Sequence, residues 1–154
     1  MTTPLSELVA LRGRWKAEGQ RVALANGCFD LLHPGHVALL EAARAHADRL
    51  IVALNSDASV RRSKGEDRPL LPEQERAEAL LALEAVDCVL IYEQDTPAEL
   101  IAALLPDVLV KGADWAADAI VGRELVEAAG GRVLRVPLVP GRSSSGLLAR
   151  ARRA

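Results

Sequence analysis

Two histidines separated by Pro-Gly, His33 and His36, are the side chains of this sequence best suited to chemistry. A glycine turn precedes them, the apolar run 22–25 before that turn predicts a buried strand, and the helix formers at 37–44 predict a following helix. Pro34 fits the first helical position, so we expect His33 at or next to the N-cap and His36 in the first turn. Two imidazoles beside the free N–H groups at the positive end of a helix indicate a phosphate-binding site.

The turn between the predicted strand and the histidines supplies further candidate residues for this phosphate-binding site. These are Asn26, Gly27, Cys28, Phe29 and Asp30. A zinc site is the alternative use of a histidine pair, but the sequence has no Cys-x-x-Cys and no second histidine pair to complete four ligands. We therefore expect no metal site built from protein ligands.

Length and composition limit the class of protein. A chain of 154 residues that is 50% hydrophobic predicts one domain, residues 1–154. A rough stripe of apolar residues predicts an N-terminal helix within 1–20. A net charge of −2 argues against nucleic-acid binding. Two cysteines are too few for a disulfide framework, and no apolar run reaches membrane-spanning length. We expect a soluble cytoplasmic protein without a membrane partner.

Short apolar segments alternate with helical ones along the rest of the chain. This pattern predicts an α/β fold, a Rossmann-like five-stranded parallel sheet with helices on both faces. Ligands bind such sheets beyond the carboxyl ends of the strands, where the glycine turn lies. The strands are predicted at 22–25, 49–55, 87–91, 107–111 and 132–136, and the helices at 4–18, 34–44, 74–83, 97–105, 121–129 and from 143–145 onward.

The segment 56–71 is the one long loop that we predict. Asp57 follows the second strand and is therefore expected at the ligand edge of the sheet. The charged, glycine-containing stretch that includes Lys64 is either solvated surface or a mobile flap that brings Lys64 onto a triphosphate. Its position after a sheet strand favours the flap.

Arg76 lies in the first turns of the helix that follows this loop. An arginine suits a bidentate grip on phosphate, whereas the simpler interpretation is an i,i+3 pair with Glu73. The sequence leaves both interpretations open.

Two later turns could also contact a nucleotide. Lys111, Gly112 and Asp114 follow the fourth strand, where the glycine would allow close approach of a flat base; a plain turn is the alternative. Ser143, Ser144 and Ser145 precede the last helix, either as a simple N-cap or as a second anion-binding helix start.

The segment 27–36 resembles the GxFDxxHxGH signature of the HxGH nucleotidyltransferase superfamily. The segments 55–60, 64–69, 83–87, 95–97 and 105–114 resemble one branch, the D-glycero-β-D-manno-heptose 1-phosphate adenylyltransferases (ADP-heptose synthase adenylyltransferase domains). The resemblance covers about residues 21–148 and implies that these residues form the catalytic core. The chain departs from this branch at Ser143-Ser144-Ser145, where the family usually carries Ser/Thr-Thr.

The resemblance implies an enzyme that transfers AMP from ATP to the heptose 1-phosphate and releases pyrophosphate, a step of lipopolysaccharide biosynthesis. It implies the nucleotidylyl transferase fold, Mg²⁺ accompanying ATP, and a homodimer or higher homo-oligomer. His33, His36 and Lys64 are then the expected catalytic residues, since positioning and charge stabilisation do most of the work in phosphoryl-type transfer. Arg76 would contact the triphosphate or the sugar phosphate.

Two other functions remain open. A cytidylyltransferase acting on glycerol 3-phosphate or a similar alcohol phosphate shares the first signature. A regulatory module that binds nucleotide without turnover is the other alternative. It predicts ATP binding without pyrophosphate release, and a function that survives His36→Ala. A dinucleotide oxidoreductase is disfavoured, because the first turn lacks Gly-x-Gly-x-x-Gly.

Overall fold

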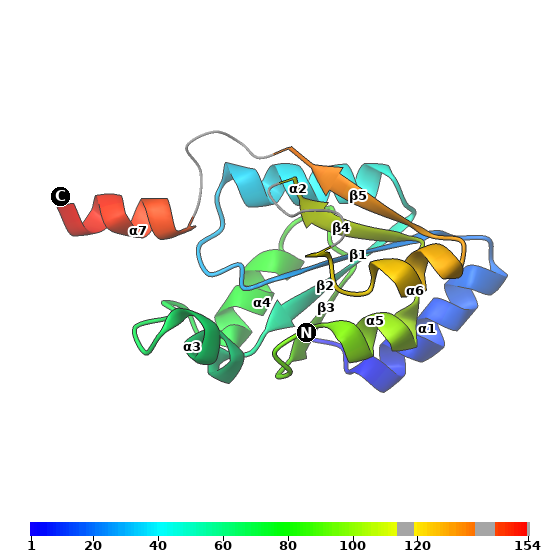
Figure 1. Cartoon of the computed structure of the whole chain (residues 1–154), viewed down its shortest axis with the longest axis horizontal. Coiled ribbons are helices and arrows are strands. Elements are labelled where there is room, and N and C mark those ends of the chain that lie inside the picture. The colour runs from blue at the N-terminus through cyan, green and yellow to red at the C-terminus, as the bar shows by residue number, and fades with distance from the viewer. Residues whose placement is uncertain (114–118, 138–143, 154) are drawn as a thin grey trace.

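The computed structural model describes residues 1–113, 119–137 and 144–153. The described residues form a five-stranded sheet in the order β3-β2-β1-β4-β5, with helices on both faces (Figure 1). Every neighbouring pair of strands is parallel, which confirms the predicted fold class. The strands are β1 (Val22–Gly27), β2 (Arg49–Asn55), β3 (Cys88–Tyr92), β4 (Val108–Gly112) and β5 (Arg132–Val136).

The strand order places a topological switch point at the middle of the sheet. The chain runs outward from β1 through β2 to β3, then crosses back to β4 on the other side of β1. The register pairs Gly27 with Leu54 and Ala25 with Val110, so the carboxyl ends of the three central strands lie side by side. Ligands of such sheets bind at this edge.

Successive side chains on each strand point to opposite faces of the sheet and pack into two separate hydrophobic cores. Ala23 and Ala25 face α2 (Pro34–Ala45) and α4 (Glu73–Leu81), whereas Val22 and Leu24 face the opposite helices. That opposite layer consists of α1 (Leu5–Ala17), α5 (Ala98–Leu104) and α6 (Arg123–Ala128). Because both faces are covered, the buried parts of the four strands β1 to β4 are almost continuously apolar, whereas the edge strand β5 carries the exposed residues Arg132 and Arg135.

The structure corrects one predicted element and trims several others. Part of the predicted loop 56–71 is a helix, α3 (Asp57–Lys64), which begins where the Ser56 hydroxyl accepts a hydrogen bond from the Ser59 N–H at 3.1 Å. The first predicted helix, 4–18, spans Leu5–Ala17. The last helix, α7 (Ser144–Arg153), extends away from the sheet at the C-terminal end in Figure 1. No helix within the described ranges has the length and apolar character that crossing a bilayer needs.

Candidate active site

The N-terminus of α2 holds the histidine pair as the sequence predicts. His33 is the N-cap residue, with extended backbone, and its Nδ1 accepts a hydrogen bond from the Gly35 N–H at 3.1 Å. Pro34 occupies the first helical position. The rings of His33 and His36 stack with 3.8 Å between centroids and 25° between planes. The two imidazoles therefore form one unit at the positive end of a helix.

The surroundings of His36 keep its ring neutral. Burial and the neighbouring His33 lower the pKa of His36 to about 4, and a backbone hydrogen bond with Leu31 opposes this only in part. The Phe29 ring packs against His36, with 5.1 Å between ring centroids. An anionic ligand would replace the lost hydration and favour the charged imidazolium, so the pair is suited to stabilising negative charge.

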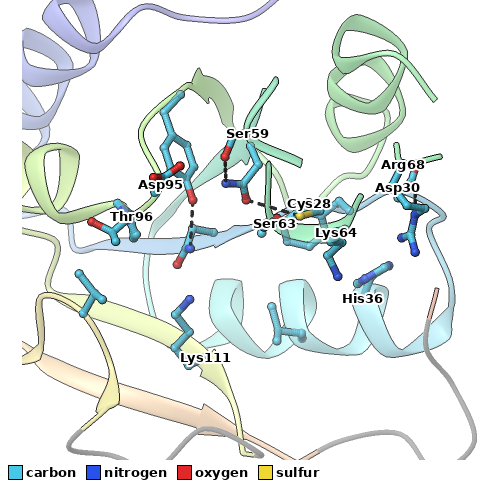
Figure 2. Close-up of a pocket in the computed structure, with 18 of the residues that line it drawn as sticks. Cys28, Asp30, His36, Ser59, Ser63, Lys64, Arg68, Asp95, Thr96 and Lys111 are labelled. Carbon is cyan, nitrogen blue, oxygen red and sulfur yellow. Dashed lines mark hydrogen bonds and ion pairs between the residues drawn. The ribbon is translucent and has the colours of Figure 1, made fainter. Parts of the chain in front are cut away.

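A cavity of about 690 Å³ opens at the carboxyl edge of the sheet beside these rings (Figure 2). Ligand sites in proteins have this size. Nine of the residues predicted from the sequence line the cavity. They are Asn26, Gly27, Cys28, Phe29, Asp30, His33, His36, Lys64 and Lys111.

The remaining predicted site residues are placed differently. Gly112 ends β4, and Asp57 begins α3; neither lines the cavity, and nor does Arg76. Asp114 and Ser143 lie outside the described residues, as do the side chains of Ser144 and Ser145, whose backbone begins α7. The predicted role of the three serines stays a prediction.

Asp30 is a structural anchor as well as a cavity-lining residue. Its carboxylate is 2% exposed and accepts hydrogen bonds from Arg68 Nε at 2.8 Å, from the Leu70 N–H at 2.9 Å and from the Leu71 N–H at 3.1 Å. Burial acts to raise the pKa of Asp30, but these hydrogen bonds outweigh it, so the pKa is lower than usual. Asp30 thus ties the segment between α3 and α4 to the glycine turn.

Lys64 is the last residue of α3 and faces the cavity from the side opposite α2. Gly65 ends the helix with φ +103°, a conformation that side chains disfavour. Figure 2 shows the Lys64 side chain entering the same space as His36. The exposed ammonium group is therefore positioned to contact an anion held by the histidine pair.

Arg76 is 1% exposed, and its guanidinium group is occupied by the protein itself. Nη1 donates to the carbonyl oxygens of Cys28 and Asn55, both at 2.8 Å, and Nε donates to that of Leu71 at 2.9 Å. Nη2 pairs with Asp57 at 2.8 Å. These contacts join the ends of β1 and β2 to the start of α4, and they support a structural role for Arg76 instead of a phosphate contact.

The predicted Glu73–Arg76 pair is replaced by two longer-range contacts. Glu73 Oε1 accepts a hydrogen bond from the Asp57 N–H at 2.9 Å, in the first turn of α3. Arg76 Nη2 donates a hydrogen bond to the Asp57 carboxylate. Both side chains therefore hold α3 in place.

Several polar residues of the cavity were missed by the sequence interpretation. Asn55 ends β2 and Tyr92 ends β3, so the rule that ligands bind at the carboxyl ends of strands was the available signal. Arg68 and Arg62 give no comparable signal, because each is one charge in a charge-rich segment. Other polar residues of the lining are Ser59, Ser63, Asp95 and Thr96.

Within the described part of the chain, no group of three or more His, Cys, Asp or Glu side chains is arranged to hold a metal ion.

The parallel sheet, the switch-point cavity and the histidine pair at a helix start define a nucleotide-binding enzyme domain. A family model described as "Cytidylyltransferase-like" matches residues 24–145. The chain belongs to this family, and it is a nucleotidyltransferase.

Curated relatives and solved structures agree with this assignment. The chain is 58% identical over 137 residues to "Bifunctional protein HldE" of Rhodopseudomonas palustris (strain BisB18), covering 89% of this chain and 28% of that protein. It is 53% identical over 148 residues to "Bifunctional protein HldE" of Hyphomonas neptunium, covering 96% of this chain and 30% of that protein. The chain thus spans less than a third of the length of these relatives.

Among solved structures, the lipopolysaccharide core biosynthesis protein from Thermoplasma volcanium superposes with a TM-score of 0.63 at 26% identity, covering 79% of this chain and 98% of that one. A pantoate–β-alanine ligase from Francisella tularensis, at 14% identity and a TM-score of 0.62, covers 94% of this chain and 69% of that one and shares the fold.

Proposed function

We propose that the chain transfers AMP from ATP to D-glycero-β-D-manno-heptose 1-phosphate, giving ADP-heptose and pyrophosphate. The observation that carries this proposal is the stacked His33–His36 pair at the start of α2, lining a cavity that Lys64 enters from the opposite side. Support for the heptose comes from the relatives named HldE and from the lipopolysaccharide core biosynthesis protein among the solved structures.

The reaction balances without a protein nucleophile. A phosphate oxygen of the sugar 1-phosphate attacks the α-phosphorus of ATP and forms the new P–O bond. The bond from the α-phosphorus to the bridging oxygen breaks on the opposite side, and its electrons leave with pyrophosphate. Charge grows on the leaving group and on the oxygens of the α-phosphorus, so fixed positive groups near them accelerate the step.

The residues of the cavity can supply those groups. The N–H groups at the start of α2 and the two imidazoles would hold the α- and β-phosphates, and His36 would gain a proton as the anion binds. The Lys64 ammonium would hold the β- and γ-phosphates from the opposite side. Ser143, Ser144 and Ser145 are proposed to hold the departing pyrophosphate at the start of α7. Mg²⁺ is part of the substrate, MgATP.

We further propose that the enzyme works in the cytoplasm, where ATP is available, as a homodimer or larger homo-oligomer.

A substrate screen tests the proposed function. The chain is incubated with ATP or CTP and with each heptose 1-phosphate anomer or glycerol 3-phosphate, and products are followed by phosphorus NMR. We expect ADP-heptose and pyrophosphate from ATP and the β-anomer. Turnover with CTP and glycerol 3-phosphate alone would establish the cytidylyltransferase alternative, and nucleotide binding without pyrophosphate release would establish a regulatory module.

A further inference from the structure

The cavity has two unlike halves across the sheet edge. Beside β4 and β5 its wall is apolar apart from Lys111, and a flat purine suits such a surface; the apolar residues are Leu39, Val121, Val136 and Pro137. Beside β1, β2 and β3 the wall is polar and uncharged at its base. Asn26 is the last residue but one of β1, and Asn55 and Tyr92 end β2 and β3. In Figure 2, Thr96 of the polar half and Lys111 of the apolar half both lie to the left of the cavity, and His36 lies to the right.

The polar half is organised by hydrogen bonds among its own side chains. Tyr92 is 6% exposed, and its hydroxyl accepts a hydrogen bond from Asn26 Nδ2 at 3.4 Å. Burial raises the pKa of Tyr92, while hydrogen bonds with Asn26 and Asn55 oppose the rise in part, so the phenol is neutral. Asn55 is held in turn, because its Nδ2 donates to Ser59 Oγ at 3.0 Å and its Oδ1 accepts from the Cys28 thiol at 3.7 Å.

One atom of this cluster lacks a partner. Asn26 Oδ1 is buried from solvent and accepts no hydrogen bond from the described residues, although Asn26 lines the cavity. If the amide is turned by 180°, Nδ2 becomes the unpaired atom instead. A buried amide atom without a partner is costly, and a bound hydroxyl group would satisfy it in either orientation, since a hydroxyl both donates and accepts.

We propose that Asn26, held in position by Tyr92, binds a hydroxyl group of a polyhydroxylated acceptor phosphate, which makes the β1–β3 half of the cavity the acceptor subsite. The inference rests on the proposed function in taking the acceptor to be a sugar phosphate. Asn26 contacts the acceptor, and Tyr92 is a positioning residue that fixes the amide. The nucleotide base occupies the apolar half, and the reacting phosphates meet between the two halves beside the histidine pair.

Steady-state kinetics of the full chain test the assignment. Pyrophosphate release is measured for wild type, Tyr92→Phe and Asn26→Ala, with ATP and acceptor varied separately. We expect each variant to raise the acceptor KM about three- to tenfold, the effect of one lost uncharged hydrogen bond, and to leave the ATP KM within about twofold. Ile91→Val is the matched control, because Ile91 precedes Tyr92 on β3 but packs into the core on the α2–α4 side; it should change neither KM.

A set of acceptors that each lack one hydroxyl group sharpens the test. The rise in acceptor KM caused by Tyr92→Phe should vanish with the compound that lacks the hydroxyl group bound by Asn26, and it should persist with the other compounds. A raised ATP KM with an unchanged acceptor KM would mean that these residues bind the ribose, and would overturn the proposal. An equal penalty for every acceptor, or no change in either KM, would overturn it as well.

The proposed function fails if the wild-type chain forms no product from heptose 1-phosphate, and this result does not depend on the variants. If wild type makes no product from heptose 1-phosphate, the same variants are compared on the alcohol phosphate that it does use. If Asn26→Ala does not fold, Tyr92→Phe decides the test, since it removes one oxygen atom and no packing volume.

Discussion

Replacing Arg76 by leucine should destabilise the protein strongly even when no nucleotide is present. The guanidinium group is buried and makes four hydrogen bonds, three to main-chain carbonyls at the ends of β1 and β2 and before α4, and one to Asp57. Leucine fills part of the space but leaves three partly buried carbonyl groups and one partly buried carboxylate without a donor.

The size of the loss follows from those unpaired groups. Breaking a buried charge pair by removing one partner costs about 3–5 kcal/mol, and each unsatisfied buried acceptor costs about 1–3 kcal/mol. Asp57 and the residues that carry the three carbonyl groups are partly exposed, so water can replace part of the lost hydrogen bonding, and we take about 3–5 kcal/mol for the whole substitution. A domain of this size loses about 2–4 °C of Tm per kcal/mol, which predicts a fall of roughly 6–20 °C.

Urea unfolding of the nucleotide-free protein, followed by circular dichroism, measures this loss. Arg76→Lys is the matched control: it keeps the charge but cannot reproduce the planar fork, so its unfolding free energy should fall between those of wild type and Arg76→Leu. The reasoning is refuted if Arg76→Leu unfolds within about 0.5 kcal/mol of wild type, the range of an ordinary surface substitution, while ATP binding is lost. Arg76 would then be a phosphate ligand.

Three further predictions concern Lys64 of α3, the turn at Gly130 and Gly131, and the pH dependence of stability. Lys64→Ala should slow pyrophosphate release about 10- to 100-fold and leave the unfolding midpoint unchanged. Arg61→Ala, on the same helix but outside the cavity, should change neither the rate nor the midpoint. Equal rate losses in the two variants would contradict a specific role of Lys64. Gly131→Ala should lower the Tm more than Gly130→Ala, because an added Cβ at 131 would lie 2.8 Å from two main-chain oxygens, whereas at 130 it meets only the strain of φ +90°; the reverse order in calorimetry would show that the turn relaxes. Since the pKa of folded His36, about 4, lies below the ordinary 6.5, the unfolded chain takes up the proton first as the pH falls, and stability is lost between pH 6.5 and 4. His36→Asn should remove about 1 kcal/mol of this loss at pH 5, after allowance for the partial exposure of the ring. Parallel urea midpoints of the two proteins across that pH range would contradict a neutral His36 ring.

The sequence was informative where a signal is local. Pro34 fixes the helix start and so the position of His33 at the cap, and the apolar runs separated by helical stretches fix the parallel sheet. Both depend on residues within a few positions of one another, and both predictions are confirmed by the structure.

Helix α3 was missed because it has no apolar stripe to reveal it. Of its eight residues only Ser59 and Val60 are buried, so a polar, charged composition was interpreted as a loop. The Ser56 cap was the one local signal of a helix start.

The role of Arg76 depended on contacts that the sequence does not reveal. Its partners Asn55 and Cys28 lie 21 and 48 residues away, and only the folded sheet brings their carbonyl groups to one guanidinium. The same holds for Asp30, whose partner Arg68 is 38 residues distant. The sequence shows that Arg76 and Asp30 are charged. It does not show how deeply each side chain is buried, and burial is what favours supporting the fold over binding phosphate.

The central claim is that the stacked histidine pair stabilises the charge that develops during nucleotidyl transfer. The most direct measurement is the rate of pyrophosphate release by His36→Ala with saturating ATP and acceptor, compared with wild type. Removing one fixed group of this kind costs about 10²- to 10³-fold in kcat, and we expect a loss of that size with the fold retained by circular dichroism. A kcat within a few-fold of wild type would contradict the claim.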